Sequence, residues 1–91
     1  MINGDPNAFI DKAYSAQEIF YKFKEEEFML QGFTIDGQSH LEIQRHFPFS
    51  QDLIWSFDGA SMQECVSAFE NEPLFDGKTF WQVEREIEWL D

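Results

Sequence analysis

The histidines and carboxylates of the central segment are the first residues whose types and spacing could support chemistry. His40 and His46 would share one face of a predicted strand with Glu42 and Gln44, and such residues can bind a transition metal. An ordinary solvent-facing strand has the same composition, and we favour that interpretation. The Asp-Gly pairs of the chain lack the ligand spacing and the bidentate glutamate of a calcium loop. We therefore expect no metal and no cofactor.

Motifs of known enzyme classes are missing from the sequence. The chain has no glycine-rich phosphate loop, no cysteine pair, no His-x-x-x-His and no Gly-x-Ser-x-Gly. Acids are common, but no feature singles out two of them for acid–base catalysis. The single Cys65 lies on the apolar stripe of a predicted helix, which indicates a buried core residue and a reducing compartment. We predict that the protein is not an enzyme.

The acidity of the chain is its strongest signal. Its 91 residues include 18 Asp and Glu against 6 Lys and Arg, which gives a formal net charge of −12. Such a charge repels nucleic acid and anionic membranes and attracts basic protein surfaces, although it could also serve solubility alone. No signal peptide and no apolar run of membrane-spanning length is recognisable. We therefore expect a cytoplasmic protein with no direct nucleic-acid or membrane partner.

The C-terminal segment 79 "TFWQVEREIEWLD" 91 predicts an acidic helix. Thr79 and Gln82 form a capping box, and an apolar stripe from Phe80 to Leu90 would dock the helix on a core. One flank would then carry a row of carboxylates, with steps of about 6 and 4.5 Å along the axis. Similar steps separate the phosphates of a nucleic-acid strand. The row consists of Glu84, Glu88 and Asp91.

Two tryptophans of the same segment would project away from that apolar stripe. Trp81 and Trp89 could anchor a protein–protein interface, or they could pack under the sheet or the first helix. An interface would also suit a homodimer that extends the negative surface. We predict a partner-binding surface made of these tryptophans and the acids around them, namely Glu64, Glu70, Glu72, Asp76, Trp81, Glu84, Glu88, Trp89 and Asp91.

Three further helices are predicted to flank the middle of the chain. Asp5-Pro6 is typical of a helix start, with an apolar face at Phe9, Ile10 and Ala13. Capping boxes at Ser15 and Ser61 predict two more helices. The first of these two would turn Ile19, Phe20 and Phe23 inward and end at 25–27, and the second would turn Met62, Cys65, Val66 and Phe69 inward and end before Pro73.

The middle of the chain alternates apolar and polar residues with the period of a half-buried strand. Asp36-Gly37 marks a turn between the first two strands. A two-residue loop there would pair Phe33 with His40, an apolar residue with a polar one, so we favour a loop of three or five residues. Pro48 interrupts the pattern before the third strand. The alternating residues are Phe33 and Ile35, then Leu41, Ile43 and Phe47, then Leu53, Trp55 and Phe57.

A short pattern recurs at three of these joints: "IDGQSHLE", "FDGASMQE" and "FDGKTFWQ". We interpret it as repeated turn chemistry, in which Asp and Gly form the turn and Ser or Thr caps the next element. Together these features predict a single acidic α+β domain over residues 1–91. It would consist of a small three-stranded antiparallel sheet with N-terminal and C-terminal helices packed on it.

The acid-rich terminal segments and the ratio of charge to length carry a resemblance at the level of class. The chain resembles the small acidic DNA-mimic proteins that phages use against host restriction, the Arn-like anti-restriction proteins. This resemblance implies a non-enzymatic inhibitor that binds a basic DNA-binding protein or nuclease through acidic helices, in the host cytoplasm if a phage encodes it. Immunity proteins and antitoxins against basic nuclease toxins share the same features. An adaptor subunit whose charge only gives solubility is the third hypothesis.

Overall fold

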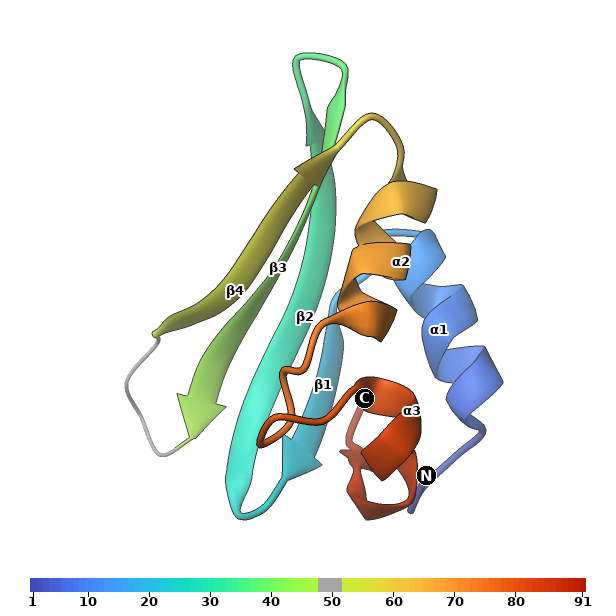
Figure 1. Ribbon diagram of the computed structural model, residues 1–91, viewed down its shortest axis with the longest axis vertical. Coiled ribbons are helices and arrows are strands. Elements are labelled where there is room, and N and C mark those ends of the chain that lie inside the picture. The colour runs from blue at the N-terminus through green and yellow to red at the C-terminus, as the bar shows by residue number, and fades with distance from the viewer. Residues whose placement is uncertain (48–51) are drawn as a thin grey trace.

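The computed structural model describes residues 1–47 and 52–91 and shows an α+β fold (Figure 1). Five antiparallel strands form one sheet in the order β4-β3-β2-β1-β5. The helices all pack on one face of this sheet, and no helix of the described residues covers the other face. The elements are α1 (Pro6–Tyr14), β1 (Ile19–Phe23), β2 (Glu26–Ile35), β3 (Gln38–Phe47), β4 (Leu53–Gly59), α2 (Met62–Asn71), α3 (Phe80–Val83), the 3-10 turn η1 (Glu84–Glu86) and β5 (Glu88–Trp89).

The α+β class is confirmed, but the sheet has five strands where three were predicted. Helix α1 begins as expected, because the Asp5 side chain accepts a hydrogen bond from the Asn7 amide and Pro6 stands at the first position. Its buried face is the predicted one, Phe9, Ile10 and Ala13. None of the helices in the described residues is long and apolar enough to cross a membrane.

The helix predicted from Ser15 is wrong. Ser15 caps the end of α1, where its hydroxyl donates to the Lys12 carbonyl at 2.7 Å, and residues 19–23 form β1. The alternation of Ile19, Tyr21 and Phe23, all buried, is that of a strand packed on one face. Phe20, which a helix would have turned inward, lies on the other face of the sheet.

The strands predicted in the middle of the chain are confirmed as β2, β3 and β4, although the predicted loop between the first two is wrong. Ile35 pairs with Gln38 and Phe33 pairs with His40, so Asp36 and Gly37 alone form the loop. Their φ angles of +51° and +80° are those of a type I′ turn, which matches the twist of a hairpin. Phe33 tolerates a polar partner because both lie on the face that no helix covers. Pro48 falls outside the described residues.

The last predicted helix is correct only in its first turn. The capping box forms at Thr79, and α3 ends at Val83. The chain then turns through η1, and β5 pairs with β1 at the sheet edge, with Trp89 opposite Tyr21. A continued helix would also have kept Phe80 and Ile87 on one face, but it would have left the β1 edge unpaired, whereas β5 pairs with it. Helix α2, by contrast, begins at Ser61 and buries Cys65, Val66 and Phe69 as predicted.

The core between the sheet and the helices is largely aromatic. Phe9 stacks on Phe80 with ring centroids 5.2 Å apart and meets Tyr21 edge-on at 5.8 Å. Phe69 and Phe75 extend this cluster toward α2 and the following loop. Burial of such rings supplies most of the favourable free energy of folding, which has to offset the self-repulsion of an acidic chain.

Candidate protein-binding surface

The carboxylate row predicted on the last helix does not exist, because the residues follow three different backbone conformations. Glu84 lies in η1 and pairs with the N-terminal ammonium of Met1. Glu88 lies in β5 and accepts a hydrogen bond from the Asn3 amide at 3.2 Å. Asp91 follows β5, and its backbone carbonyl accepts from the Phe20 amide at 2.7 Å. The helical steps predicted for these acids therefore do not apply.

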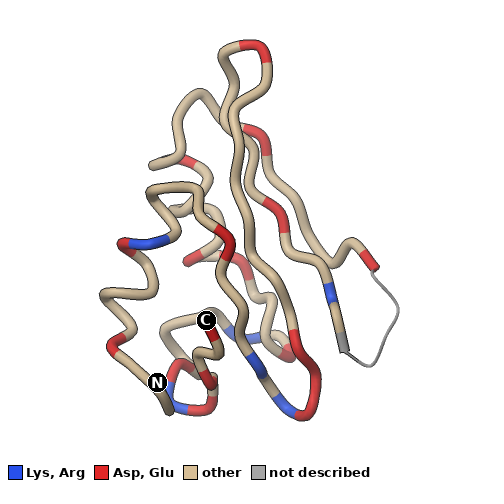
Figure 2. The backbone as a smooth tube through the Cα atoms, turned by 180° about the vertical axis from the view of Figure 1, so that it is seen from behind, with Lys and Arg blue, Asp and Glu red and all other residues tan. Residues whose placement is uncertain are grey.

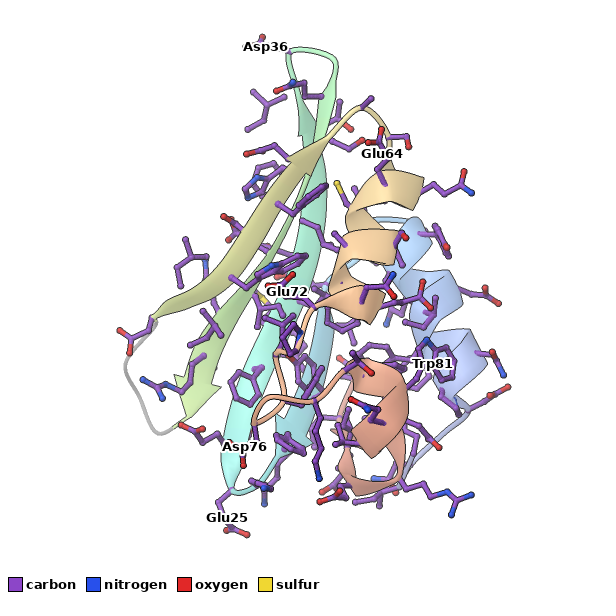
Figure 3. The ribbon with its side chains drawn as sticks, viewed as in Figure 1. Glu25, Asp36, Glu64, Glu72, Asp76 and Trp81 are labelled. Atoms are coloured by element: carbon purple, nitrogen blue, oxygen red, sulfur yellow. The ribbon has the colours of Figure 1, made fainter. Side chains whose placement is uncertain are left out.

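The two tryptophans of this segment have different environments. Trp81 is 41% exposed at the start of α3, and its indole Nε1 donates to Glu70 Oε2 at 2.7 Å (Figure 3). Trp89 is half-buried in β5, where its ring meets Phe9 edge-on at 5.5 Å and lies under the Lys12 ammonium at 5.9 Å. Trp89 thus packs within its own fold, whereas Trp81 stays accessible to another molecule.

The remaining predicted acids are spread along the molecule (Figure 3). Glu64 and Glu72 are exposed at the two ends of α2, with Glu70 between them. Asp76 lies far from Glu64, in the turn before α3, and pairs with Lys24 at 2.6 Å. The lysine donates to the Asp76 carboxylate and holds its pKa below the ordinary value. The predicted site residues therefore do not form one surface.

The lysines and arginines gather at one end of the sheet (Figure 2). Lys24 sits in the β1–β2 turn and pairs with Asp76, and Arg45 pairs with Glu26 at 2.7 Å and with Asp52 at 2.5 Å. Of the six cations, all of which belong to the described residues, Lys12 alone lies elsewhere, on α1. Of the others, Lys22 lies on β1 just before this turn, Lys78 lines the same hollow as Lys24, and Arg85 lies in η1.

The opposite end of the sheet carries acids without lysine or arginine among the described residues. Asp36 occupies the tip of the β2–β3 hairpin, Asp58 lies near the end of β4 and Glu64 lies in the first turn of α2. All three are exposed. With Glu42 on β3, we refer to these residues as the acidic end. No Lys or Arg of the described chain lies beside these acids, whereas at the other end Asp76, Glu26 and Asp52 pair with Lys24 and Arg45.

His40 is the one titratable cation that contacts the acidic end in the described chain. Its Nδ1 lies 2.7 Å from Asp58 Oδ1 on β4, and its Nε2 lies 2.8 Å from Glu42 Oε1 on its own strand. The hydrogen bond to Asp58, together with the one to Glu42, raises the pKa of His40 even though partial burial opposes the charge. The ring also lies on Phe33, with centroids 4.7 Å apart.

Glu42 is only 13% exposed although no helix covers its face of the sheet. Burial alone would raise the pKa of Glu42, but hydrogen bonds from Gln31, His40 and Gln44 outweigh this effect and lower it. Gln31 donates at 3.0 Å and Gln44 at 2.8 Å. Neighbouring side chains thus fix an ionised carboxylate in the middle of the uncovered face.

The uncovered face also presents apolar side chains to solvent. Phe33 and Ile35 lie near the hairpin tip, 37% and 55% exposed, while Leu53 and Leu90 lie toward the other end. Phe33 and Ile35 share this face with His40 and Gln38, their partners on β3. A sheet face of this kind, apolar at intervals around a polar network, is a typical site for contact with another protein.

Sequence reasoning found part of this arrangement and missed its key partner. Of the four residues predicted to share one strand face, His40, Glu42 and Gln44 are joined by hydrogen bonds, whereas His46 contacts Phe20. Asp58 was missed, because only the two-residue loop and the β3–β4 register bring it opposite His40. Within the described residues, no three His, Cys, Asp or Glu side chains are arranged to hold a metal ion.

The thiol of Cys65 is not presented to solvent. Cys65 is fully buried under Ser39, and burial raises the pKa of its thiol. A hollow of about 240 Å³ beside Lys24 and Asp76 is smaller than the roughly 300–1,000 Å³ of ordinary ligand pockets.

Comparison with known proteins adds no family: no family model, no curated protein and no solved structure matches the chain.

Proposed function

We propose that the protein is a non-enzymatic inhibitor that imitates the charge of DNA and binds the basic surface of a DNA-binding protein or nuclease. The binding surface we propose is the acidic end, together with the adjoining part of the uncovered sheet face. It replaces the C-terminal helix that the sequence suggested. The observation that carries the proposal is that Lys and Arg gather at one end of the sheet, while Asp36 and Glu64 at the other end are exposed and have no ion pair with a described residue.

Electrostatics supports this assignment in two ways. A net charge of −12 attracts the whole molecule to basic surfaces, and the acidic end has no Lys or Arg of its own that would repel such a surface. The carboxylates that pair with Arg45 and Lys24 already have partners within the chain. Asp36 and Glu64 are exposed and have no ion pair with described residues, so a partner's Lys and Arg can reach them as they would reach phosphates.

We propose a non-enzymatic protein because the Cys65 thiol and the His40 imidazole are both poorly placed to react with a substrate. The thiol of Cys65 is buried and its pKa is raised, which disfavours the nucleophilic thiolate. Both ring nitrogens of His40 are occupied by carboxylates, so the imidazole does not offer a free lone pair to a substrate. Binding through surface charge requires neither group to react.

The test compares two variants that change the net charge equally at opposite ends of the sheet. Asp36→Asn with Glu64→Gln neutralises the acidic end, and these residues suit the left-handed turn and the helix start. Glu25→Asn with Glu86→Gln is the matched control, since Glu25 also has a left-handed φ of +69° and both acids are exposed. The partner is first captured from lysate at low salt and eluted by salt, and its DNA binding is then measured.

We expect the acidic-end variant to bind the captured partner about tenfold more weakly and the control variant to bind within about twofold of wild type. The complex should compete with DNA for the partner and weaken steeply with salt. Equal losses from the two variants would mean that charge acts without a localised surface. A partner that still binds DNA within the complex would contradict the mimic function.

One observation favours a second function, that of an adaptor subunit. Phe33, Ile35 and Leu53 leave apolar surface on the uncovered face, which a partner could bury without using the acids. Such a complex would be held mainly by apolar contact, so its affinity would change little with salt. The salt dependence measured on the captured complex therefore separates the two functions.

A further inference from the structure

His40 joins three strands at the acidic end, and its contacts specify its protonation state. Each ring nitrogen lies within 2.8 Å of a carboxylate oxygen, one from Asp58 and one from Glu42. An ionised carboxylate only accepts hydrogen bonds, so both nitrogens have to carry a proton. This geometry favours the imidazolium form, whose ring lies tilted against Phe33 of β2 with the ring centroids 4.7 Å apart.

The two carboxylates differ in how firmly the rest of the chain holds them. The side chain of Glu42 is 13% exposed and also accepts from Gln31 and Gln44, so it stays in place without His40. The side chain of Asp58 is 65% exposed. When the imidazolium loses a proton to solvent, Nε2 keeps its proton, which it donates to Glu42, and the Nδ1 proton leaves. The Nδ1 lone pair then repels Asp58, whose carboxylate can turn into water.

The charge around the His40 ring is set by His40, Glu42 and Asp58, because the other side chains that face the ring are neutral. On β2, Phe33 and Gln31 face the ring and are neutral. On β3 and β4 the facing charges are Glu42 and Asp58 themselves. Glu64 of α2 lies on the helix-covered side, beside Gly59 and Cys65.

We propose that His40 is a proton-controlled switch in the acidic end, which holds Asp58 as an imidazolium and releases this carboxylate to a basic partner on deprotonation. This role rests on the proposed function. The local charge of the three groups changes from −1 to −2 in the process. While His40 is an imidazolium, a cationic partner has to compete with it for Asp58. Once the Nδ1 proton has left, the Asp58 carboxylate is free to pair with the partner. Binding of cations at this end therefore strengthens as the pH rises.

The protonation step is tested by NMR, with imidazole ¹⁵N shifts followed from about pH 5 to about pH 9. We expect both His40 nitrogens to be protonated at low pH and the Nδ1 proton to be lost at a midpoint above about 6.5, the value of a free histidine. Asp58→Asn should lower this midpoint, and His46, whose ring contacts Phe20, serves as a reference in the same spectra. A His40 ring that is already neutral at pH 6, or that keeps Nδ1–H when neutral, would overturn the switch.

The release of Asp58 is tested with a decaarginine peptide at about 50 mM salt, where charges are screened over little more than 10 Å. We expect the wild-type protein to bind the peptide about two- to fivefold more tightly at about pH 8.5 than at about pH 6. His46→Gln should keep this change and His40→Gln should abolish it. The same change in His40→Gln would overturn the proposed release. Lack of peptide binding at either pH would contradict the proposed function itself, whereas the NMR titration decides the protonation step independently.

Discussion

The two ends of the sheet use the same turn geometry, but only one of them carries lysine and arginine beside its acids. The β1–β2 turn places Lys24 and Glu25 at φ angles of +49° and +69°, and the β2–β3 turn places Asp36 and Gly37 at +51° and +80°. The first turn meets the loop before α3, where Asp76 pairs with Lys24. The second projects beyond the helices into solvent (Figure 1). Local backbone geometry thus sets the hairpin, while the packed neighbours decide whether its charges are neutralised.

The two ends of the sheet also differ in how much apolar surface they bury. Near the β1–β2 turn, β5 and η1 close the sheet edge and bury Ile87 completely. Near the β2–β3 turn, Ile35 is 55% exposed and packs against no helix of the described residues. The end at the β1–β2 turn therefore stabilises the fold through apolar burial, whereas the end at the β2–β3 turn leaves apolar surface exposed that a partner can cover.

The largest expected effect comes from cutting an isoleucine back at each end. Ile87→Ala should lower the free energy of unfolding by about 2–5 kcal/mol, because it leaves a cavity among packed rings. Ile35→Ala should change it by less than about 0.5 kcal/mol, since the side chain is already half in water. Urea denaturation followed by tryptophan fluorescence measures both. A comparable loss in the two variants would contradict the assignment of separate roles.

A smaller effect is expected from exchanging the residues at the left-handed turn positions. Glu25→Gly should stabilise the fold by about 0.5–1 kcal/mol, because glycine adopts the φ of +69° without a clash. Gly37→Ala should destabilise it by about 1 kcal/mol, because it introduces that clash at φ +80°. Thermal unfolding at matched pH compares the two. If both substitutions stabilise the fold, or both destabilise it, the two turns do not share one geometry.

The smallest expected effect is the dependence of stability on pH through the His40 network. The pKa of His40 is raised on folding, so its contribution is complete below about pH 6.5 and is lost as the pH rises through the folded value. The pKa of Glu42 is lowered, so its contribution is complete above its ordinary value and is lost as the pH falls through the folded one. Stability should therefore be highest between these two ranges.

Asp58→Asn provides the matched control for this pH dependence. In the wild-type protein we expect the free energy of unfolding to fall by about 0.5 kcal/mol above about pH 6.5, and Asp58→Asn should remove most of this fall. The loss of stability at acidic pH, which depends on Glu42, should remain. Denaturant midpoints measured from about pH 4 to about pH 9 report both limbs. A decline on the alkaline side that persists in this variant would assign the effect to another group.

Several elements were predictable because their signals are local. The Asp5-Pro6 start of α1, the Ser61 cap of α2 and the Asp36-Gly37 turn depend on residues within a few positions of each other. The apolar spacing of α2 also specified its buried face correctly. By contrast, Ile19, Phe20 and Phe23 fit a helix and a strand equally well, and pairing of β1 with two neighbours decided for the strand.

Composition and local spacing determined the acidity, the class of the fold and the starts of its helices, because these depend on residue types or on contacts within one turn. The tertiary structure alone decided where the charges lie. Asp58 contacts His40 from the neighbouring strand, and Glu84 contacts the N-terminal ammonium, 83 positions away in the sequence. The physical reason is that strand register and the closure of a sheet edge are set by the burial of distant side chains such as Ile87, which no local pattern records.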